Sequence, residues 1–234
     1  MDYEVKYLLD DSKVLKSFGE LTDDVKKTFK MKNFEEIDLQ FVETEAFEFM
    51  KAGWTNRLRY KKATKKFTLT FKRRYEVEGA NLEEALKRAA ADGFSPENKN
   101  YRAEVDWGYK KMTLSFSNRK EFNYKKLPDQ ENSIELIKEK APGKWLQSTG
   151  TDLLEKSRIF GPVTSHKYIG KFEGEKIVIE IWPLKSSYFV EVSFKEKKYK
   201  NALKRRELLF QCLEEKGWVL HEESMKTQAL LKEY

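Results

Sequence analysis

Apolar residues alternate with polar or charged residues in several short segments of this 234-residue chain. An alternation with a period of two gives a β-strand one apolar and one polar face, so each segment predicts a strand. The predicted strands cover residues 2–9, 38–44, 55–62, 66–73, 101–107, 112–117, 176–182 and 188–195. Eight strands are enough to close an antiparallel barrel.

The segments between these strands carry helix signals. Asn81 can cap a helix that Asp92-Gly93 ends, and Pro142-Gly143 marks a turn after another. Helices are predicted over residues 11–17, 45–51, 82–91 and 198–216. A further helix is predicted to begin near residue 129 or 133 and to end at residue 141. Because no stretch rich in Pro, Gly or Ser separates these elements, we expect a single domain spanning residues 1–234.

The charged residues of the predicted strands share one face. On the first strand, Glu4 and Lys6 lie opposite Tyr3 and Val5. Other charged residues grouped by this parity are Arg57, Arg59 and Lys61; Arg102, Glu104 and Asp106; Lys176 and Glu180; and Glu191 and Lys195. A sheet with one face in water is the ordinary interpretation. The predicted helices, however, need an apolar sheet surface to cover, which favours an α+β fold: a closed barrel with helices outside and the charged face inside.

Charges of both signs inside a barrel predict a ligand, because unpaired charges away from water are costly. Arg and Lys side chains bind phosphate oxygens through charge-assisted hydrogen bonds. Carboxylates would repel the same phosphates unless they held a hard cation such as Mg²⁺ or Mn²⁺, which prefers oxygen ligands. The charged face therefore predicts a metal-bridged triphosphate or polyphosphate.

The composition narrows the function further. With 46 basic and 39 acidic residues the net charge is +7, an excess too small to predict a nucleic-acid partner. The single cysteine, Cys212, excludes an internal disulfide and argues against a cysteine-based zinc site. Without a signal-peptide pattern or an apolar run of bilayer length, we expect a cytoplasmic protein with no membrane partner. The sequence has neither a P-loop nor a Gly-x-Ser-x-Gly elbow, which argues against the common nucleotide-binding folds and against a serine hydrolase.

Short motifs also follow one another along the chain in a distinctive order. They are Asp2-Tyr3-Glu4-Val5-Lys6, Gln40-Phe41-Val42-Glu43-Thr44, Arg57-Leu58-Arg59, Thr68-Leu69-Thr70-Phe71-Lys72, Arg102-Ala103-Glu104-Val105-Asp106, Lys156-Ser157-Arg158, Glu180 and Phe189-Val190-Glu191-Val192-Ser193. Over nearly the whole chain this series resembles the CYTH superfamily, or triphosphate tunnel metalloenzymes, which opens with Glu-x-Glu-x-Lys. Asp2 replaces the first Glu of that motif, and Glu43 replaces an Asp. Ser193 replaces a carboxylate of the metal set, and water can fill the lost ligand position.

The resemblance implies an eight-stranded tunnel in which the terminal phosphate of a triphosphate is hydrolysed. The metal ligands that it implies for Mg²⁺ or Mn²⁺ are Asp2, Glu4, Glu180 and Glu191. The phosphate-binding residues that it implies are Lys6, Arg57, Arg59, Lys72, Lys156 and Arg158. Glu104 and Asp106 would position a second metal or the attacking water, and with Lys6 they form the predicted catalytic group.

Two functions remain open from the sequence. The favoured one is metal-dependent hydrolysis of inorganic triphosphate or a small organic triphosphate. The alternative is a non-catalytic or weakly active polyphosphate or nucleotide binder that kept its basic residues, which the serine at position 193 would suit. Cyclisation of ATP and cleavage of RNA 5′-triphosphates are less favoured, because no motif identifies a base or nucleoside pocket.

Overall fold

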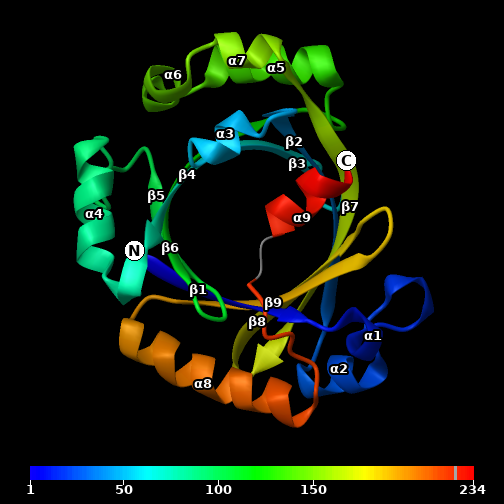
Figure 1. Cartoon of the computed structure of the whole chain (residues 1–234). Helices are drawn as coiled ribbons and strands as arrows, with labels where there is room; N and C mark the ends of the chain where they lie inside the picture. Colours follow the sequence, from blue (N-terminus) through cyan, green and yellow to red (C-terminus); the bar gives the residue numbers. More distant parts are fainter. Residues whose placement is uncertain (224–225) are drawn as a thin grey trace. The chain divides into compact units, whose positions relative to one another are not determined.

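The structure, a computed structural model, describes residues 1–223 and 226–234. The strands are β1 (Asp2–Leu9), β2 (Asn33–Thr44), β3 (Trp54–Lys61), β4 (Lys66–Val77), β5 (Arg102–Trp107), β6 (Met112–Phe122), β7 (Ser157–Phe172), β8 (Glu175–Pro183) and β9 (Tyr188–Glu196). The α-helices are α1 (Asp11–Val14), α2 (Asp23–Thr28), α3 (Glu48–Lys51), α4 (Leu82–Ala91), α5 (Gln130–Lys140), α6 (Gly143–Thr149), α7 (Asp152–Glu155), α8 (Tyr199–Glu215) and α9 (Lys226–Glu233). Figure 1 labels these elements along the chain.

The strands are hydrogen-bonded in the order β1-β5-β6-β4-β3-β2-β7-β8-β9 and close into a barrel. The predicted α+β barrel is therefore confirmed, with two corrections. The described residues form nine strands rather than eight, because β7 interrupts its alternation at Gly161, Pro162 and Gly170. Nine strands cannot alternate in direction around a closed ring, so at least one neighbouring pair is parallel and the barrel is mixed. The ladders β1/β9, β2/β3, β3/β4, β7/β8 and β8/β9 are antiparallel.

Residue contacts divide the chain into two compact units. The first contains Met1–Glu36, Val105–Met112 and Thr164–Tyr234, and the second contains Ile37–Glu104 and Thr113–Val163. Neither unit is one continuous stretch of sequence, so the chain passes between them several times. The expectation of one domain over residues 1–234 stays a prediction.

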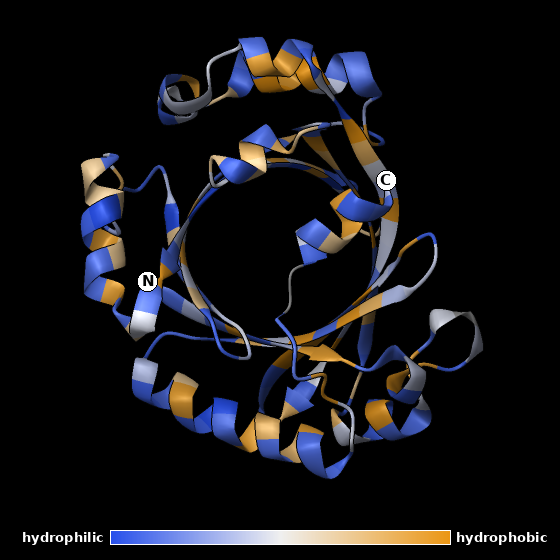
Figure 2. Cartoon of the chain, viewed as in Figure 1, coloured by the Kyte–Doolittle hydropathy of each residue, from blue (hydrophilic) through white to orange (hydrophobic). Residues whose placement is uncertain are grey.

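In the first unit, β1, β8 and β9 have one apolar and one charged face. Val5 pairs with Phe194 on the apolar face, which α8 covers through a contact between the rings of Tyr7 and Phe210, 5.4 Å apart at their centroids. Lys6 points to the opposite face because it lies one residue from both Val5 and Tyr7. Figure 1 shows α8 and α9 on opposite sides of these strands, and Figure 2 shows the alternation of apolar and polar residues along them.

In the second unit, β3 and β4 are divided in the same way. Phe71 is fully buried on one face, where its ring centroid lies 5.8 Å from that of Trp145 of α6. The indole Nε1 of Trp145 donates to Asn56 Oδ1 at 2.9 Å on the same face. Arg57 is paired with Thr70 on the opposite face. Each unit therefore confirms the predicted separation of apolar and charged faces.

The helix boundaries follow local capping chemistry. Asn81 Oδ1 accepts from the backbone N–H of Glu84 at 3.1 Å, and Asp129 Oδ1 accepts from that of Asn132 at 3.0 Å, as expected for N-cap residues. At Pro142, where the sequence predicts only a turn, helix α6 begins with the next residue. The structure also contains helices that the sequence did not predict, namely α2, α6, α7 and α9.

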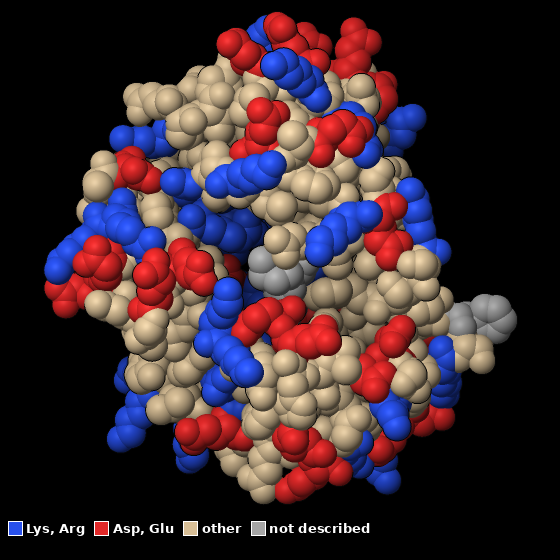
Figure 3. Space-filling model, in the orientation of Figure 1, with Lys and Arg blue, Asp and Glu red and all other residues tan. Residues whose placement is uncertain are grey.

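Acidic and basic side chains are interspersed over the face of the molecule shown in Figure 3. This agrees with the similar numbers of basic and acidic residues in the sequence, 46 and 39. In the part of the chain that the structure describes, no helix is long and apolar enough to cross a membrane.

Glu43, which belongs to one of the sequence motifs, has a structural role. Its side chain is 3% exposed. Its Oε1 accepts from the backbone N–H groups of Thr44 and Phe49, each at 2.9 Å, and its Oε2 accepts from that of Met50 at 2.8 Å. Two of these donors belong to the first turn of α3, whose N–H groups have no partner within the helix. The carboxylate of Glu43 therefore caps α3.

We expect Glu43→Ala to lower the free energy of unfolding by about 2–3 kcal/mol, because three backbone N–H groups would lose their acceptor at a buried site. Urea denaturation followed by circular dichroism measures the loss. Glu48→Ala removes a carboxylate from the same helix without removing this cap, and it should cost less than about 1 kcal/mol. Equal losses in the two variants would contradict the capping role.

Candidate functional site

Glu180 and Glu191 face each other across the β8/β9 ladder, and a lysine of α9 lies between them. The Nζ of Lys226 is 2.6 Å from Glu180 Oε2 and 2.6 Å from Glu191 Oε1. Glu191 is only 2% exposed. Like charges directly opposite each other on neighbouring strands repel, so the ammonium compensates this pair. No sequence motif points to Lys226, which sequence reasoning missed.

Lys6 binds a second pair of carboxylates on the same unit. Its Nζ is 2.7 Å from Asp106 Oδ1 and 3.3 Å from Glu4 Oε2. The Nζ of Lys195, a more exposed side chain, is 3.6 Å from the same oxygen of Glu4. The structure thus brings together three of the residues that the sequence predicts for the site, Lys6, Glu4 and Asp106.

Burial disfavours the charged form of both lysines, and the carboxylates reverse that effect. Burial lowers the pKa of Lys6, but the two carboxylates that it binds and Glu191 hold this pKa well above its ordinary value. Burial also lowers the pKa of Lys226, yet its two glutamate partners raise it above the ordinary value, against a smaller opposing effect of Lys6. Both lysines are therefore charged at neutral pH.

Ser193, where the motif resemblance implies a carboxylate, lies directly opposite Lys6 in the β1/β9 ladder. It is 8% exposed. A carboxylate at this position would lie beside the Lys6 ammonium. In this chain the hydroxyl carries no charge, and Lys6 pairs with Asp106 and Glu4.

The four predicted metal ligands fall into two pairs. Asp2 and Glu4 are two residues apart on β1, whereas Glu191 faces Leu8 of that strand and pairs with Glu180. Among residues 1–223 and 226–234, no three His, Cys, Asp or Glu side chains form a ready metal site. Mg²⁺ commonly takes one or two protein carboxylates and completes its shell with phosphate oxygens and water, so the Glu180–Glu191 pair fits such an ion. The assignment of these residues as metal ligands stays a prediction.

In the second unit, the predicted phosphate-binding residues of β3 and β4 share one face. Their cross-strand pairs are Arg57 with Thr70, Arg59 with Thr68, and Lys72 with Thr55. All three threonines are buried. The face therefore combines guanidinium, ammonium and hydroxyl donors, a set that suits phosphate oxygens.

The other predicted residues of the second unit have different surroundings. Lys156 is exposed and follows α7 immediately, outside β7. Arg158 forms an ion pair with Glu45, and its guanidinium carbon lies 3.8 Å from the ring centroid of Phe160. The buried Glu104 lies 3.2 Å from a guanidinium nitrogen of Arg102. The predicted roles of Lys156, Arg158 and Glu104 stay predictions.

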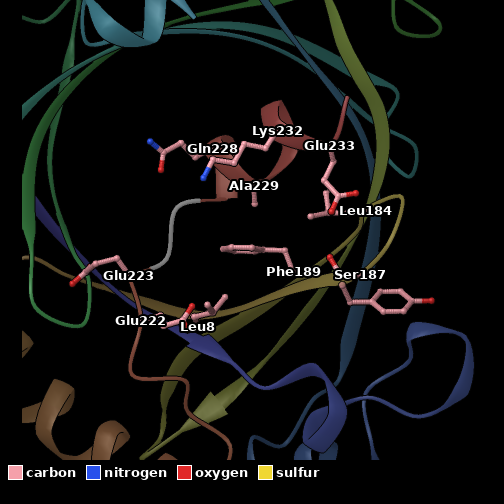
Figure 4. Close-up of a pocket in the computed structure, with 11 residues that line it drawn as sticks. Leu8, Leu184, Ser187, Phe189, Glu222, Glu223, Gln228, Ala229, Lys232 and Glu233 are labelled. Atoms are coloured by element: carbon pink, nitrogen blue, oxygen red, sulfur yellow. The ribbon is translucent and has the colours of Figure 1, made fainter.

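A cavity of about 390 Å³ borders α9 in the first unit. Phe189 of β9 and Ala229 of α9 both line it, with Gln228 and Lys232 on the helix side (Figure 4). Phe189 is two residues from Glu191 and so shares its face of β9. Helix α9 therefore lies over the charged face of this sheet, with space beside it.

Comparison of the sequence with protein-family models and with curated proteins gives no match. Among solved structures, HpAC1 from Hippeastrum, described as a "putative adenylyl cyclase" with a dominant triphosphatase activity, has a TM-score of 0.55 at 12% identity, covering 94% of this chain and 90% of that protein. A protein of Bacillus halodurans described as a "putative adenylate cyclase" has a TM-score of 0.53 at 13% identity, covering 96% and 95%. The PH1819 protein of Pyrococcus horikoshii has a TM-score of 0.52 at 13% identity, over the full length of both chains.

These likenesses establish the fold. The chain has the barrel fold of solved proteins described as adenylate cyclases, one of them with a dominant triphosphatase activity. The barrel fold that the resemblance to the CYTH superfamily implies is therefore confirmed.

We expect Lys6→Met and Asp106→Asn each to lower the free energy of unfolding by about 2–3 kcal/mol, because each breaks a largely buried ion pair. The double variant should lose clearly less free energy of unfolding than the two single variants lose together, since neither charge is then left without its partner. Urea denaturation of all four proteins gives the coupling energy. Lys195→Met removes the more exposed lysine beside Glu4 and should cost less than about 1 kcal/mol. Additive losses for Lys6 and Asp106 would contradict the pairing.

Proposed function

We propose that this protein hydrolyses the terminal phosphate of inorganic triphosphate or a small organic triphosphate with the help of Mg²⁺ or Mn²⁺. The observation that carries the proposal is the facing pair Glu180–Glu191, with Glu191 buried, on the charged side of β8 and β9. Buried carboxylates that face each other need a cation, and a divalent ion held there would attract a polyphosphate. The fold shared with HpAC1, described as having a dominant triphosphatase activity, supports the same reaction.

The carboxylates would hold the metal. Glu180 and Glu191 are the proposed primary ligands, and Asp2 and Glu4 of β1 are the further ligands implied by the sequence motif. A bound divalent ion would neutralise phosphate charge and polarise the phosphoryl group. The protein's contribution is to keep these oxygens in place and mostly out of water, where their interaction with the ion is strong.

The cations would bind and orient the triphosphate. The guanidinium groups of Arg57 and Arg59 can each donate two parallel hydrogen bonds to phosphate oxygens, whereas Lys72 acts as a point charge. Lys156 and Arg158 are the further phosphate ligands that the motif implies. Phosphoryl transfer spreads negative charge over the phosphate oxygens, so fixed cations around them lower the barrier.

Glu104, Asp106 and Lys6 form the proposed catalytic group. Glu104 and Asp106 share one face of β5, because they are two residues apart. Their carboxylates would accept hydrogen bonds from a water molecule and direct its oxygen at the terminal phosphorus. Asp106, 2.7 Å from the Lys6 ammonium, also positions a charge that would stabilise the oxygens of the transferred phosphate.

A polyphosphate or nucleotide binder without hydrolysis is the second candidate. It is favoured by Ser193, which supplies no carboxylate, and by Lys226, whose ammonium already bridges Glu180 and Glu191. Such a protein would bind the phosphates through its arginines and lysines and would not need the metal for chemistry.

We expect the protein to release phosphate from tripolyphosphate with Mg²⁺ or Mn²⁺, and Glu191→Gln to lower kcat on the order of a hundredfold, because several kcal/mol of charge stabilisation depend on the ion. Colorimetric phosphate release measures both. Glu175→Gln changes an exposed glutamate at the start of the same strand, β8, and should leave kcat unchanged. Tight calorimetric binding of tripolyphosphate with no metal-dependent release would favour the binder.

Lys72→Ala should weaken the binding of tripolyphosphate roughly tenfold, because one charge-assisted bond to the phosphates is lost. Lys66→Ala, at an exposed lysine of the same strand β4, is the matched control and should bind as the unchanged protein does. Calorimetry gives the affinities, and circular dichroism checks that β4 is still folded. Equal binding by the two variants would remove Lys72 from the site.

A further inference from the structure

Helix α9 carries a lysine onto the carboxylate pair that we propose as the metal site. The Nζ of Lys226 lies 2.6 Å from one oxygen of Glu180 and from one oxygen of Glu191. It also lies 5.4 Å from the ring centroid of Trp182, within the range of a cation–π contact. Two carboxylate oxygens that both bind one nitrogen at 2.6 Å lie near each other, and a small side-chain adjustment would let them share a divalent ion at its shorter bond lengths. The ammonium therefore lies where a divalent ion bridging this pair would lie.

Apolar and polar contacts hold α9 in place. Leu230 and Leu231 are its buried residues, and the Oε1 of Glu233 accepts from the hydroxyl of Ser186 at 2.7 Å. The cavity of about 390 Å³ lies beside the helix at Gln228 and Ala229 (Figure 4). A helix of eight residues is not stable by itself in water. Its place over β8 and β9 therefore depends on tertiary contacts, among them those of the two leucines and Glu233 and the ion pairs of Lys226.

We propose that Lys226 is a tethered counter-cation that occupies the Glu180–Glu191 pair until a divalent metal displaces it, and that this displacement releases α9 from the charged face. The inference rests on the proposed function and adds the regulation of its metal site. A metal that has to displace a bound ammonium binds more weakly than it would to the vacant pair. Its apparent Kd is the Kd for the vacant pair divided by the fraction of molecules in which Lys226 is off the pair.

Competition for the same oxygens makes metal binding and helix docking reciprocal. Metal binding has to loosen α9, and a variant without the Lys226 charge has to bind metal more tightly. A lysine with a purely structural role would behave differently, because its removal would cost stability without changing the competition. The affinity for the metal therefore separates the two roles.

The test is calorimetric titration of Mn²⁺, with no phosphate compound present, into the full-length protein and its Lys226→Gln variant. We expect the variant to bind Mn²⁺ with a Kd roughly tenfold lower. Lys232→Gln changes a lysine further along the same helix, beside the cavity, and should keep the unchanged affinity. Glu191→Gln should abolish binding, alone or combined with Lys226→Gln, because it removes a ligand rather than the competitor.

Hydrogen exchange of the unchanged protein provides a second measurement, which stands even if Lys226→Gln fails to fold. Saturating Mn²⁺ should speed exchange of the α9 amides and leave those of α8 unchanged. Equal Mn²⁺ affinities of the protein and Lys226→Gln, or α9 exchange unaffected by Mn²⁺, would overturn the counter-cation role and leave the metal site standing. Absence of Mn²⁺ binding in both proteins would overturn the metal site itself, and this inference with it.

Discussion

The neutralisation of buried charge is the constraint on which the rest of this structure depends. Strands β1, β8 and β9 use one face to pack against α8, so most of their charged residues are left on the other face. Glu191, at 2% exposure, has little contact with water, and a buried carboxylate is costly without a cation beside it. The ammonium groups of Lys226 and Lys6 meet this need, and their positions define the candidate site.

The sequence predicts the strand faces well because alternation is a local signal. Ile177, Ile179 and Ile181 are fully buried, as their parity predicts, and Glu180 lies on the other face. Alternation does not predict strand β7, and the cause is physical. A Cβ at Gly170 would lie 2.1 Å from the carbonyl oxygen of Phe29, so the close approach of the chain there requires glycine, a residue that weakens any strand prediction.

The charged residues of the site are equally local in origin, but their partners are not. Glu4 and Lys6 belong to one motif, and alternation is enough to place them on one face. That Asp106 joins them depends on β5 lying next to β1, which the sequence does not show. Lys226 lies on a short helix after the last predicted element and reaches carboxylates 35 and 46 residues earlier in the chain. Local patterns cannot predict such contacts, because they arise only when the strands are assembled.

The cost of a buried ion network argues that these charges serve more than stability. Well-packed apolar residues can often replace a buried ion pair with no loss, or with a gain, of stability. The apolar face of the same strands shows that the chain can fill such space with Val5, Ile179 and Val192. The charged face instead keeps Glu180, Glu191 and Lys226. The ammonium of Lys226 compensates the charge of both glutamates, and they compensate its charge. Such a group of charges is useful where one cation can replace another. The carboxylate oxygens of Glu180 and Glu191 can then bind the Lys226 ammonium in the absence of a divalent metal and the metal in its presence.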